Sequence, residues 1–187
     1  MTCPLDGLRV LEYTGALGQY AGKLLADMGA DVVKVEPPHG SEARGIGPFV
    51  DDEPGLNRSL NFWYHNTNKR SVIADLMTEA GLERWRGLVS KADIVIEDAA
   101  PGMLTELGAG YEALLASHPD LIWCSITPFG QDGPWAHYQA TDLIGLAVGV
   151  VGKSQMWIGM IGGAVGGALG GALLEGVHNW LKDPLTG

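Results

Sequence analysis

Residues 8–36, "LRVLEYTGALGQYAGKLLADMGADVVKVE", contain the clearest secondary-structure pattern in the chain. Residues 8–14 form a β-rich run, and residues 18–30 place apolar side chains at helical spacing, with Gly29 as a stop signal. Residues 31–36 predict a second strand, because two prolines follow a run rich in valine. A strand, a helix and a strand of these lengths predict a parallel crossover unit.

The rest of the chain repeats this alternation. Further strands are expected over 70–76, 93–98 and 121–130, and helices over 78–92, 103–108 and 111–119. Thr78 is expected to cap its helix, whose buried stripe is Leu82, Trp85, Leu88 and Val89. Residues 39–68 lose periodicity and predict a long loop that is functional or pairs with something else. We therefore expect an α/β fold, a Rossmann-like open parallel sheet with flanking helices, which binds ligands beyond its strands' carboxyl ends.

Composition excludes several classes of function. The 187 residues carry a formal net charge of −10, which disfavours nucleic acids and anionic membranes as partners. Cys3 and Cys124 have no CxxC partner and the five histidines are scattered, so we expect a reducing cytoplasm, no disulfide and no metal site. The first residues alternate polar and apolar, which does not predict a signal peptide.

The first turn, "TGALG" at residues 14–18, joins a strand to a helix, and Glu36 ends the next strand. These features fit a dinucleotide site in which the helix N-terminus holds a pyrophosphate and Glu36 holds a ribose. The full G-x-G-x-x-G pattern is absent, however. We favour a tight turn, with Glu36 ending its strand in water.

Other charged residues also follow or precede strands. Asp75, Glu97 and Asp98 stand at or just past strand ends, where they either meet in a ligand crevice or cap the helices that follow. The run "NTNKR", residues 66–70, precedes a strand and fits a phosphate contact or an ordinary loop with a solvated charge pair. The residues alone leave both choices open.

Five long runs, in this order, resemble the family III CoA-transferases, which include formyl-CoA transferase, the carnitine CoA-transferases and the α-methylacyl-CoA racemases. The runs are "LDGLRVLEYT", "LLADMGADVVKVEPP", "SLNFWYHNTNKRSVIADL", "KADIVIEDAAPGML" and "LGAGYEALLASHPDLIWCSITPFGQDGPWAHYQATDL", within residues 4–150. The resemblance implies a Rossmann-like domain that binds coenzyme A (CoA), and a homodimer of interlocked chains.

The resemblance also implies a covalent exchange. An active-site aspartate attacks the acyl-CoA thioester to give a mixed anhydride, the CoA thiolate returns to form an enzyme thioester, and a second carboxylic acid collects the CoA. Acyl-CoA and a carboxylic acid are therefore the expected substrates. No metal and no permanently bound cofactor are expected.

Carried over position by position, the family's CoA contacts fall mainly on segments that follow strands. They are Ala16, Leu17, Ala74, Asp75, Leu76, Met77, Asp98, Ala99, Ala100, Gln139, Ala140, Thr141 and Asp142. Family members often carry cations near the CoA phosphates where this chain has Met77 and Glu106, so Glu106 is expected to weaken CoA binding. The racemase branch has a histidine at the position of Thr141, which favours transferase ancestry here.

The tail, residues 153–187, is expected to be a Gly-rich helix appended to a CoA-binding domain over 1–152. Counted without gaps, the family's nucleophilic aspartate falls near Gly171, and no Asp occurs between Asp142 and Asp183. No catalytic residue is therefore assigned. An uncharged run in the tail approaches the length of a membrane span, but its many glycines favour close packing on its own domain or a second copy.

Three functions follow as hypotheses. The first is a truncated or divergent family III CoA-transferase, catalytically impaired because its nucleophile is not found. The second is a non-catalytic CoA- or nucleotide-binding module that self-associates through its Gly-rich helix. The third, a membrane-attached protein with an α/β head, is the least favoured.

Overall fold

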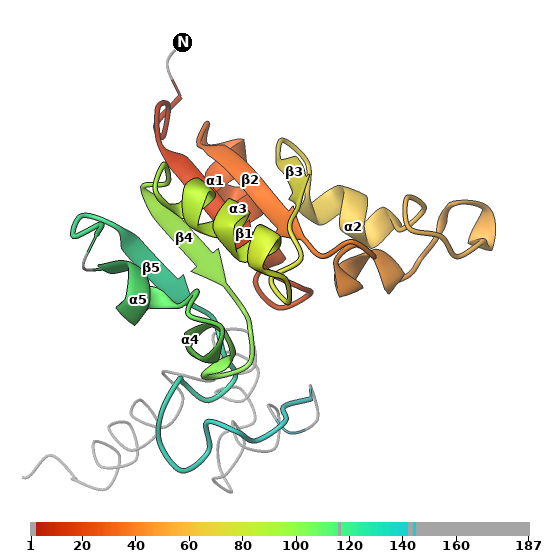
Figure 1. Cartoon of the computed structure of the whole chain (residues 1–187). Coiled ribbons are helices and arrows are strands. Elements are labelled where there is room, and N and C mark those ends of the chain that lie inside the picture. The colour runs from red at the N-terminus through yellow and green to blue at the C-terminus, as the bar shows by residue number, and fades with distance from the viewer. Residues whose placement is uncertain (1–2, 116, 142–143, 145–187) are drawn as a thin grey trace, which may run out of the picture. The chain divides into compact units, whose positions relative to one another are not determined.

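Five parallel strands form one sheet in the computed structural model, which describes residues 3–115, 117–141 and 144. The strands are β1 (Arg9–Tyr13), β2 (Asp31–Glu36), β3 (Arg70–Ile73), β4 (Ile94–Glu97) and β5 (Ile122–Ser125). They lie in the order β3-β2-β1-β4-β5 (Figure 1). The predicted α/β fold with an open parallel sheet is confirmed. The chain divides into two compact units, Met1–Ile126 and Thr127–Gly187, and the first holds the whole sheet.

Successive side chains in the inner strands point to opposite faces of the sheet. In β1, Val10 belongs to a cluster with α1 (Gln19–Asp27), whereas Leu11 belongs to a cluster with α3 (Glu79–Val89). The two helices therefore cover opposite faces of the sheet, α3 in front and α1 behind in Figure 1. This two-sided burial explains why the strands are rich in valine and isoleucine.

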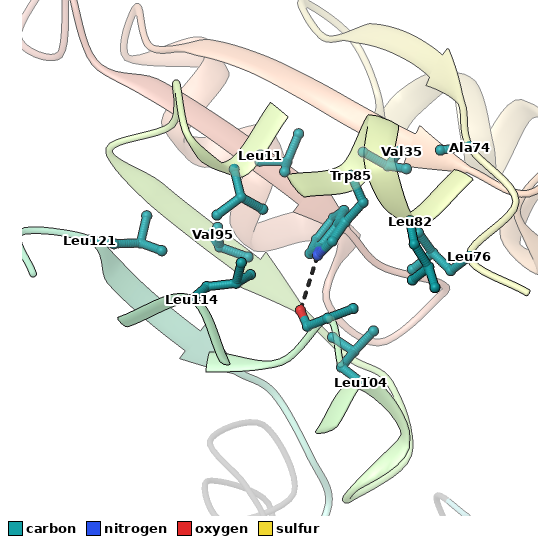
Figure 2. Close-up of a cluster of buried hydrophobic side chains, with 12 residues drawn as sticks. Leu11, Val35, Ala74, Leu76, Leu82, Trp85, Val95, Leu104, Leu114 and Leu121 are labelled. Atoms are coloured by element: carbon teal, nitrogen blue, oxygen red, sulfur yellow. Dashed lines mark hydrogen bonds between the residues drawn. The ribbon is translucent and has the colours of Figure 1, made fainter. Parts of the chain in front are cut away.

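The larger core surrounds Trp85, whose side chain is fully buried. Its indole Nε1 donates a hydrogen bond of 3.0 Å to the carbonyl oxygen of Ala109, drawn as a dashed line in Figure 2. Leucines from α3, α4 (Met103–Glu106) and α5 (Tyr111–Leu115) fill the same cluster. The predicted stripe is confirmed, with Leu82 and Val89 buried and Leu88 partly buried.

Helix boundaries follow the local signals. The Thr78 hydroxyl accepts a hydrogen bond from the Gly81 amide and caps α3, as predicted. Gly29 has a φ of +101°, which suits a glycine at the end of α1.

The expectation of a long loop over residues 39–68 is wrong in part. This segment contains two short 3₁₀ helices, Glu42–Gly45 and Val50–Asp52, and then α2 (Leu60–His65). The Ser59 hydroxyl accepts from the Phe62 amide and caps α2. Phe62 is the only α2 side chain that is buried, so α2 shows no apolar period that the sequence could reveal.

The second unit is described for residues 127–141 and 144. Within it, the rings of Phe129 and Trp135 meet edge to face, with centroids 6.4 Å apart. The predicted helical tail over 153–187 and the predicted boundary after residue 152 lie outside the described residues. In the part of the chain that is described, no helix combines the length and apolar character needed to cross a bilayer.

Candidate functional site

The strand order places a switch point between β1 and β4. The chain passes from β1 to β2 and β3 on one side, and then returns to β4 and β5 on the other. Open α/β sheets commonly bind their ligands beyond the carboxyl ends of the strands at such a switch point. The loops concerned are Gly15–Gly18 after β1 and Asp98–Ala100 after β4.

Asp98 joins these two loops. Its Oδ1 accepts a hydrogen bond of 2.7 Å from the Gly15 amide, and its Oδ2 accepts one of 2.8 Å from the Gly18 amide. Gly18 is the N-cap residue of α1. The sequence left open whether Asp98 binds a ligand or caps the helix that follows it. In the structure Asp98 does cap a helix, but that helix is α1 and not the one that follows Asp98 in sequence. Burial raises the pKa of Asp98, although the two amide donors act in the opposite direction.

A buried ion pair supports the turn from the α1 side. Glu12 and Lys34 are register partners in β1 and β2, and their side chains are 0% and 1% exposed. The Lys34 ammonium donates to Glu12 Oε1 at 2.8 Å and to the Thr14 carbonyl at 2.6 Å. The Thr14 hydroxyl also donates to Glu12 Oε1, at 2.6 Å. This network fixes the carbonyl from which the first turn starts.

Lys69 completes a buried triad with Glu12 and Lys34. Its ammonium lies 2.7 Å from Glu12 Oε2 and forms an ion pair with it. It also donates to the Gln19 carbonyl at 2.7 Å and to Asn66 Oδ1 at 3.0 Å. Burial lowers the pKa of Lys69, and Glu12 opposes that shift.

Both interpretations of residues 66–70 are therefore wrong for Lys69, whose side chain is only 1% exposed. It is available neither to a phosphate nor to water. Arg70 does lie at the surface, but its guanidinium is paired with both oxygens of Asp31.

Glu36 holds the segment between β2 and α2. Its two oxygens accept from Nε and Nη2 of Arg44, at 2.6 and 2.8 Å, and it also accepts from the Ser41 amide and the Ser71 hydroxyl. Burial acts to raise the pKa of Glu36, but these hydrogen bonds outweigh burial and lower it to about 2. The expectation that Glu36 ends its strand in water is wrong, because the residue is 2% exposed and bonded on both oxygens.

The structure places the predicted CoA contacts at differing depths. Ala16, Leu17, Met77 and Ala100 are exposed, and Asp75, Asp98 and Ala99 are half-buried. Ala74 and Leu76 are 2% and 3% exposed and belong to the core around Trp85, so their side chains are not available to a ligand. Gln139, Ala140 and Thr141 are exposed in the second unit. Asp142, like Gly171, lies outside the described residues.

The hydroxyl of Tyr13, at the end of β1, is influenced by the charges of residues that follow β3 and β4. Burial raises the pKa of its hydroxyl, and the charges of Asp98 and Asp75 raise it further. The phenol at the end of β1 is thus within electrostatic reach of carboxylates that follow β4 and β3. Asp75 also accepts from the Met77 amide, and Glu97 from the Ala99 amide, so each shapes its own loop.

Sequence reasoning missed Glu12, Lys34 and Tyr13. A signal was present for the first two, since each is a charge inside its strand with an apolar or aromatic residue on both sides. An isolated charge in a strand buried on both faces requires a partner, and the neighbouring strand offered the opposite charge. Over residues 3–115, 117–141 and 144, no three His, Cys, Asp or Glu side chains gather as a metal site requires.

The strand order and the capped first turn define a Rossmann-like α/β domain whose topological switch point lies between β1 and β4. The family model described as CoA-transferase family III matches residues 5–163. The chain belongs to this family, which confirms the resemblance.

Three known proteins illustrate the similarity. The chain is 49% identical over 146 residues to the succinate–glutarate CoA-transferase of Agrobacterium fabrum, covering 75% of this chain and 36% of that protein. It is 41% identical over 143 residues to the acetyl-CoA:oxalate CoA-transferase of Acetobacter aceti, covering 75% and 36%. The crystal structure of a CaiB/BaiF family protein from Brucella suis has 43% identity and a TM-score of 0.73, over 80% of this chain and 40% of that one. The chain spans about a third of the length of the curated relatives it matches.

Proposed function

We propose that this chain acts in the transfer of CoA between an acyl-CoA thioester and a carboxylic acid, and that the carboxyl edge of its sheet binds the CoA. The observation that carries the proposal is the junction of the β1 and β4 loops through Asp98, at the switch point of a family III domain. The names of the relatives agree, because each pairs an acyl-CoA or acid donor with a carboxylic acid acceptor.

The proposed contacts are those that the resemblance implies. Leu17 and Met77, which are 57% and 73% exposed, offer apolar side chains on the loops after β1 and β3. Asp98 and Ala100 belong to the loop after β4. The resemblance also implies CoA contacts at residues 139–142. CoA enters as a substrate in this proposal, so no cofactor is bound permanently.

Binding of CoA and exchange of CoA are separate properties here. A carboxylate nucleophile must stand beside the thioester for the exchange to proceed. The register of the family places that carboxylate near Gly171, and glycine has no side chain to attack with. We therefore propose that the 187-residue chain binds acyl-CoA but does not by itself exchange its CoA.

Calorimetry and isotope exchange test the two properties separately. Purified chain is titrated with CoA and then incubated with succinyl-CoA and isotopically labelled CoA. Saturable CoA binding without label exchange is the expected result. Exchange above the rate without protein would disprove the impairment, and absence of CoA binding would disprove the site.

The alternative is a non-catalytic module that binds CoA and self-associates through residues 153–187. The glycine near the expected nucleophile favours it, because close helix packing then remains a function for the tail. Sedimentation of the full chain tests this alternative. The masses of the Gly163→Leu and Gly167→Leu variants are compared with the mass of the unchanged protein. The module predicts dissociation in both variants, and an unchanged mass would rule it out.

We also propose a homodimer in the cytoplasm. The exposed side of α1 carries Tyr20, Leu24 and Met28 at helical spacing, each at least 40% exposed, which supports association. Cys3 and Cys124 are free, which supports a reducing compartment. Light scattering tests the dimer through Leu24→Asp, which should halve the mass if α1 lies in the interface. Fractionation of cells that express the chain tests the compartment.

A further inference from the structure

The first turn of this domain has the form of an anion site whose donors are already used. A glycine-containing turn that opens a helix presents free amides and the positive end of the helix dipole, which together favour a phosphate. Here the amides of Gly15 and Gly18 both point at the carboxylate of Asp98. One amide is bonded to each carboxylate oxygen, at 2.7 and 2.8 Å, so the chain's own anion fills the position.

The backbone of Asp98 is held in that position by a hydrogen bond to β1. Its amide donates to the Tyr13 carbonyl at 3.3 Å, which continues the pairing of β1 with β4 by one residue beyond the strands. The turn that receives the carboxylate is fixed in turn by Lys34, whose ammonium is bonded to the Thr14 carbonyl. The backbone of Asp98 and the start of the turn are therefore both held in place.

A second carboxylate faces the same turn. A β-carbon built on Gly15 would overlap the Glu42 carboxylate, so Glu42 lies directly against the turn. The charge of Glu42 also acts on Asp98, whose pKa it helps to raise. A phosphate approaching the Gly15 and Gly18 amides would therefore meet two negative charges as well as an occupied pair of donors.

We propose that Asp98 is a specificity-determining residue that occupies the phosphate position of the α1 N-terminus and keeps the pyrophosphate of nucleotides off it. This excludes binding of dinucleotides in the usual manner of Rossmann-like domains. The consequence for CoA rests on the proposed function: its diphosphate must lie away from the first turn, and only its other parts contact Ala16 and Leu17.

The test follows the amide signals of Gly15 and Gly18 by ¹H–¹⁵N NMR of the full chain during titration with inorganic pyrophosphate. In the unchanged protein both signals should stay in place. In Asp98→Ala the two amides lose their acceptor, so both signals should move saturably as pyrophosphate is added. The apparent affinity for pyrophosphate should be at least tenfold tighter than in the unchanged protein. Asp93→Ala is the matched control, because Asp93 accepts from one backbone amide, that of Arg9, and from no helix N-terminus.

Every outcome decides the proposal. Equal saturable shifts in the unchanged protein and in Asp98→Ala overturn it, and so does the absence of shifts in a folded Asp98→Ala. If Asp98→Ala does not fold, Asp98→Asn removes the charge and keeps the shape, and it should also gain pyrophosphate-dependent shifts. Calorimetry with CoA on the unchanged protein is read independently, so a failure of the CoA site is distinguishable from a failure of this proposal.

Discussion

Gly22 of α1 lies directly over the carboxylate of Glu12 in β1. A β-carbon at position 22 would overlap Glu12 Oε2 and come within 3.2 Å of the Lys69 ammonium. The helix can cross the sheet at this height only because residue 22 has no side chain. One glycine therefore permits a buried charge network to exist between α1 and the sheet.

Gly22→Ala should destabilise the protein by roughly 1–3 kcal/mol, which is typical of overpacking. The end of a glutamate is usually free to move, but Glu12 is fully buried and held by Lys34, Thr14 and Lys69. Urea unfolding measures the effect. Gly87→Ala is the control, because Gly87 lies inside α3 with nothing within 4 Å of a new β-carbon, and it should gain about 0.4–1 kcal/mol. Equal stability of Gly22→Ala and the unchanged protein would contradict the overlap.

Lys34→Met should cost about 3–5 kcal/mol, the usual effect of removing one partner from a buried ion pair. The variant leaves Glu12 Oε1 without its ammonium and removes a donor from the Thr14 carbonyl. Arg9→Met is the control at the surface, where Arg9 pairs with Asp93 and 55% of the arginine side chain is exposed. That change should cost about 0–1 kcal/mol. Similar losses in the two variants, measured by urea unfolding, would show that burial of the Lys34 pair has no special weight.

Glu36 should make the protein sensitive to acid in a defined range. Its pKa is about 2 in the folded protein against an ordinary value of 4.5, so the unfolded chain binds the extra proton. The contribution of Glu36 is then complete above about pH 4.5, on the order of 3 kcal/mol, and falls progressively toward pH 2. Unfolding free energies at several pH values should show a shallower dependence in Glu36→Gln. Glu53→Gln, at a side chain 74% exposed, should keep the original dependence. The same slope in all three proteins would refute the assignment.

Trp85→Phe should destabilise the protein by about 1–3 kcal/mol. Phenylalanine keeps much of the apolar contact but cannot donate to the buried Ala109 carbonyl. Loss of the indole donor from a buried acceptor costs free energy of folding. Trp63→Phe makes the same chemical change at a residue that is 50% exposed, and it should be nearly neutral. Thermal unfolding of the two variants gives the comparison, and matching melting temperatures would exclude a structural role for the indole hydrogen bond.

The sequence predicted the sheet because the signals for it are local. Valine-rich runs, the glycine after α1 and the Thr78 cap each act within a few residues, so a pattern reveals them. The predicted strand 121–130 was nevertheless too long, since β5 covers only Ile122–Ser125. Beyond Ser125 nothing in the apolar pattern marks where pairing with β4 ends.

The candidate site was predictable only in outline. Asp98 was recognisable as a carboxylate at a strand end, but its partners Gly15 and Gly18 are 83 and 80 residues away in sequence. Lys69 and Glu36 were placed in or near water because charged residues usually are. Their burial depends on Glu12 and Arg44, which reach them only through the sheet and through the fold of residues 41–62.

A cation on the loop after β3 should strengthen CoA binding, if the carboxyl edge is the CoA site. Met77 is 73% exposed there, at a position where the family often has a cation near the phosphates. Met77→Lys should tighten binding by a factor of roughly two to five, the effect of one exposed ion pair, and the gain should shrink at high salt. Ile122→Lys adds the same charge at the amino end of β5, where Ile122 is 61% exposed, and should leave the affinity unchanged. Calorimetry at two salt concentrations distinguishes the cases, because an equal gain in both variants would indicate a general effect of net charge and not a phosphate held at the loop after β3.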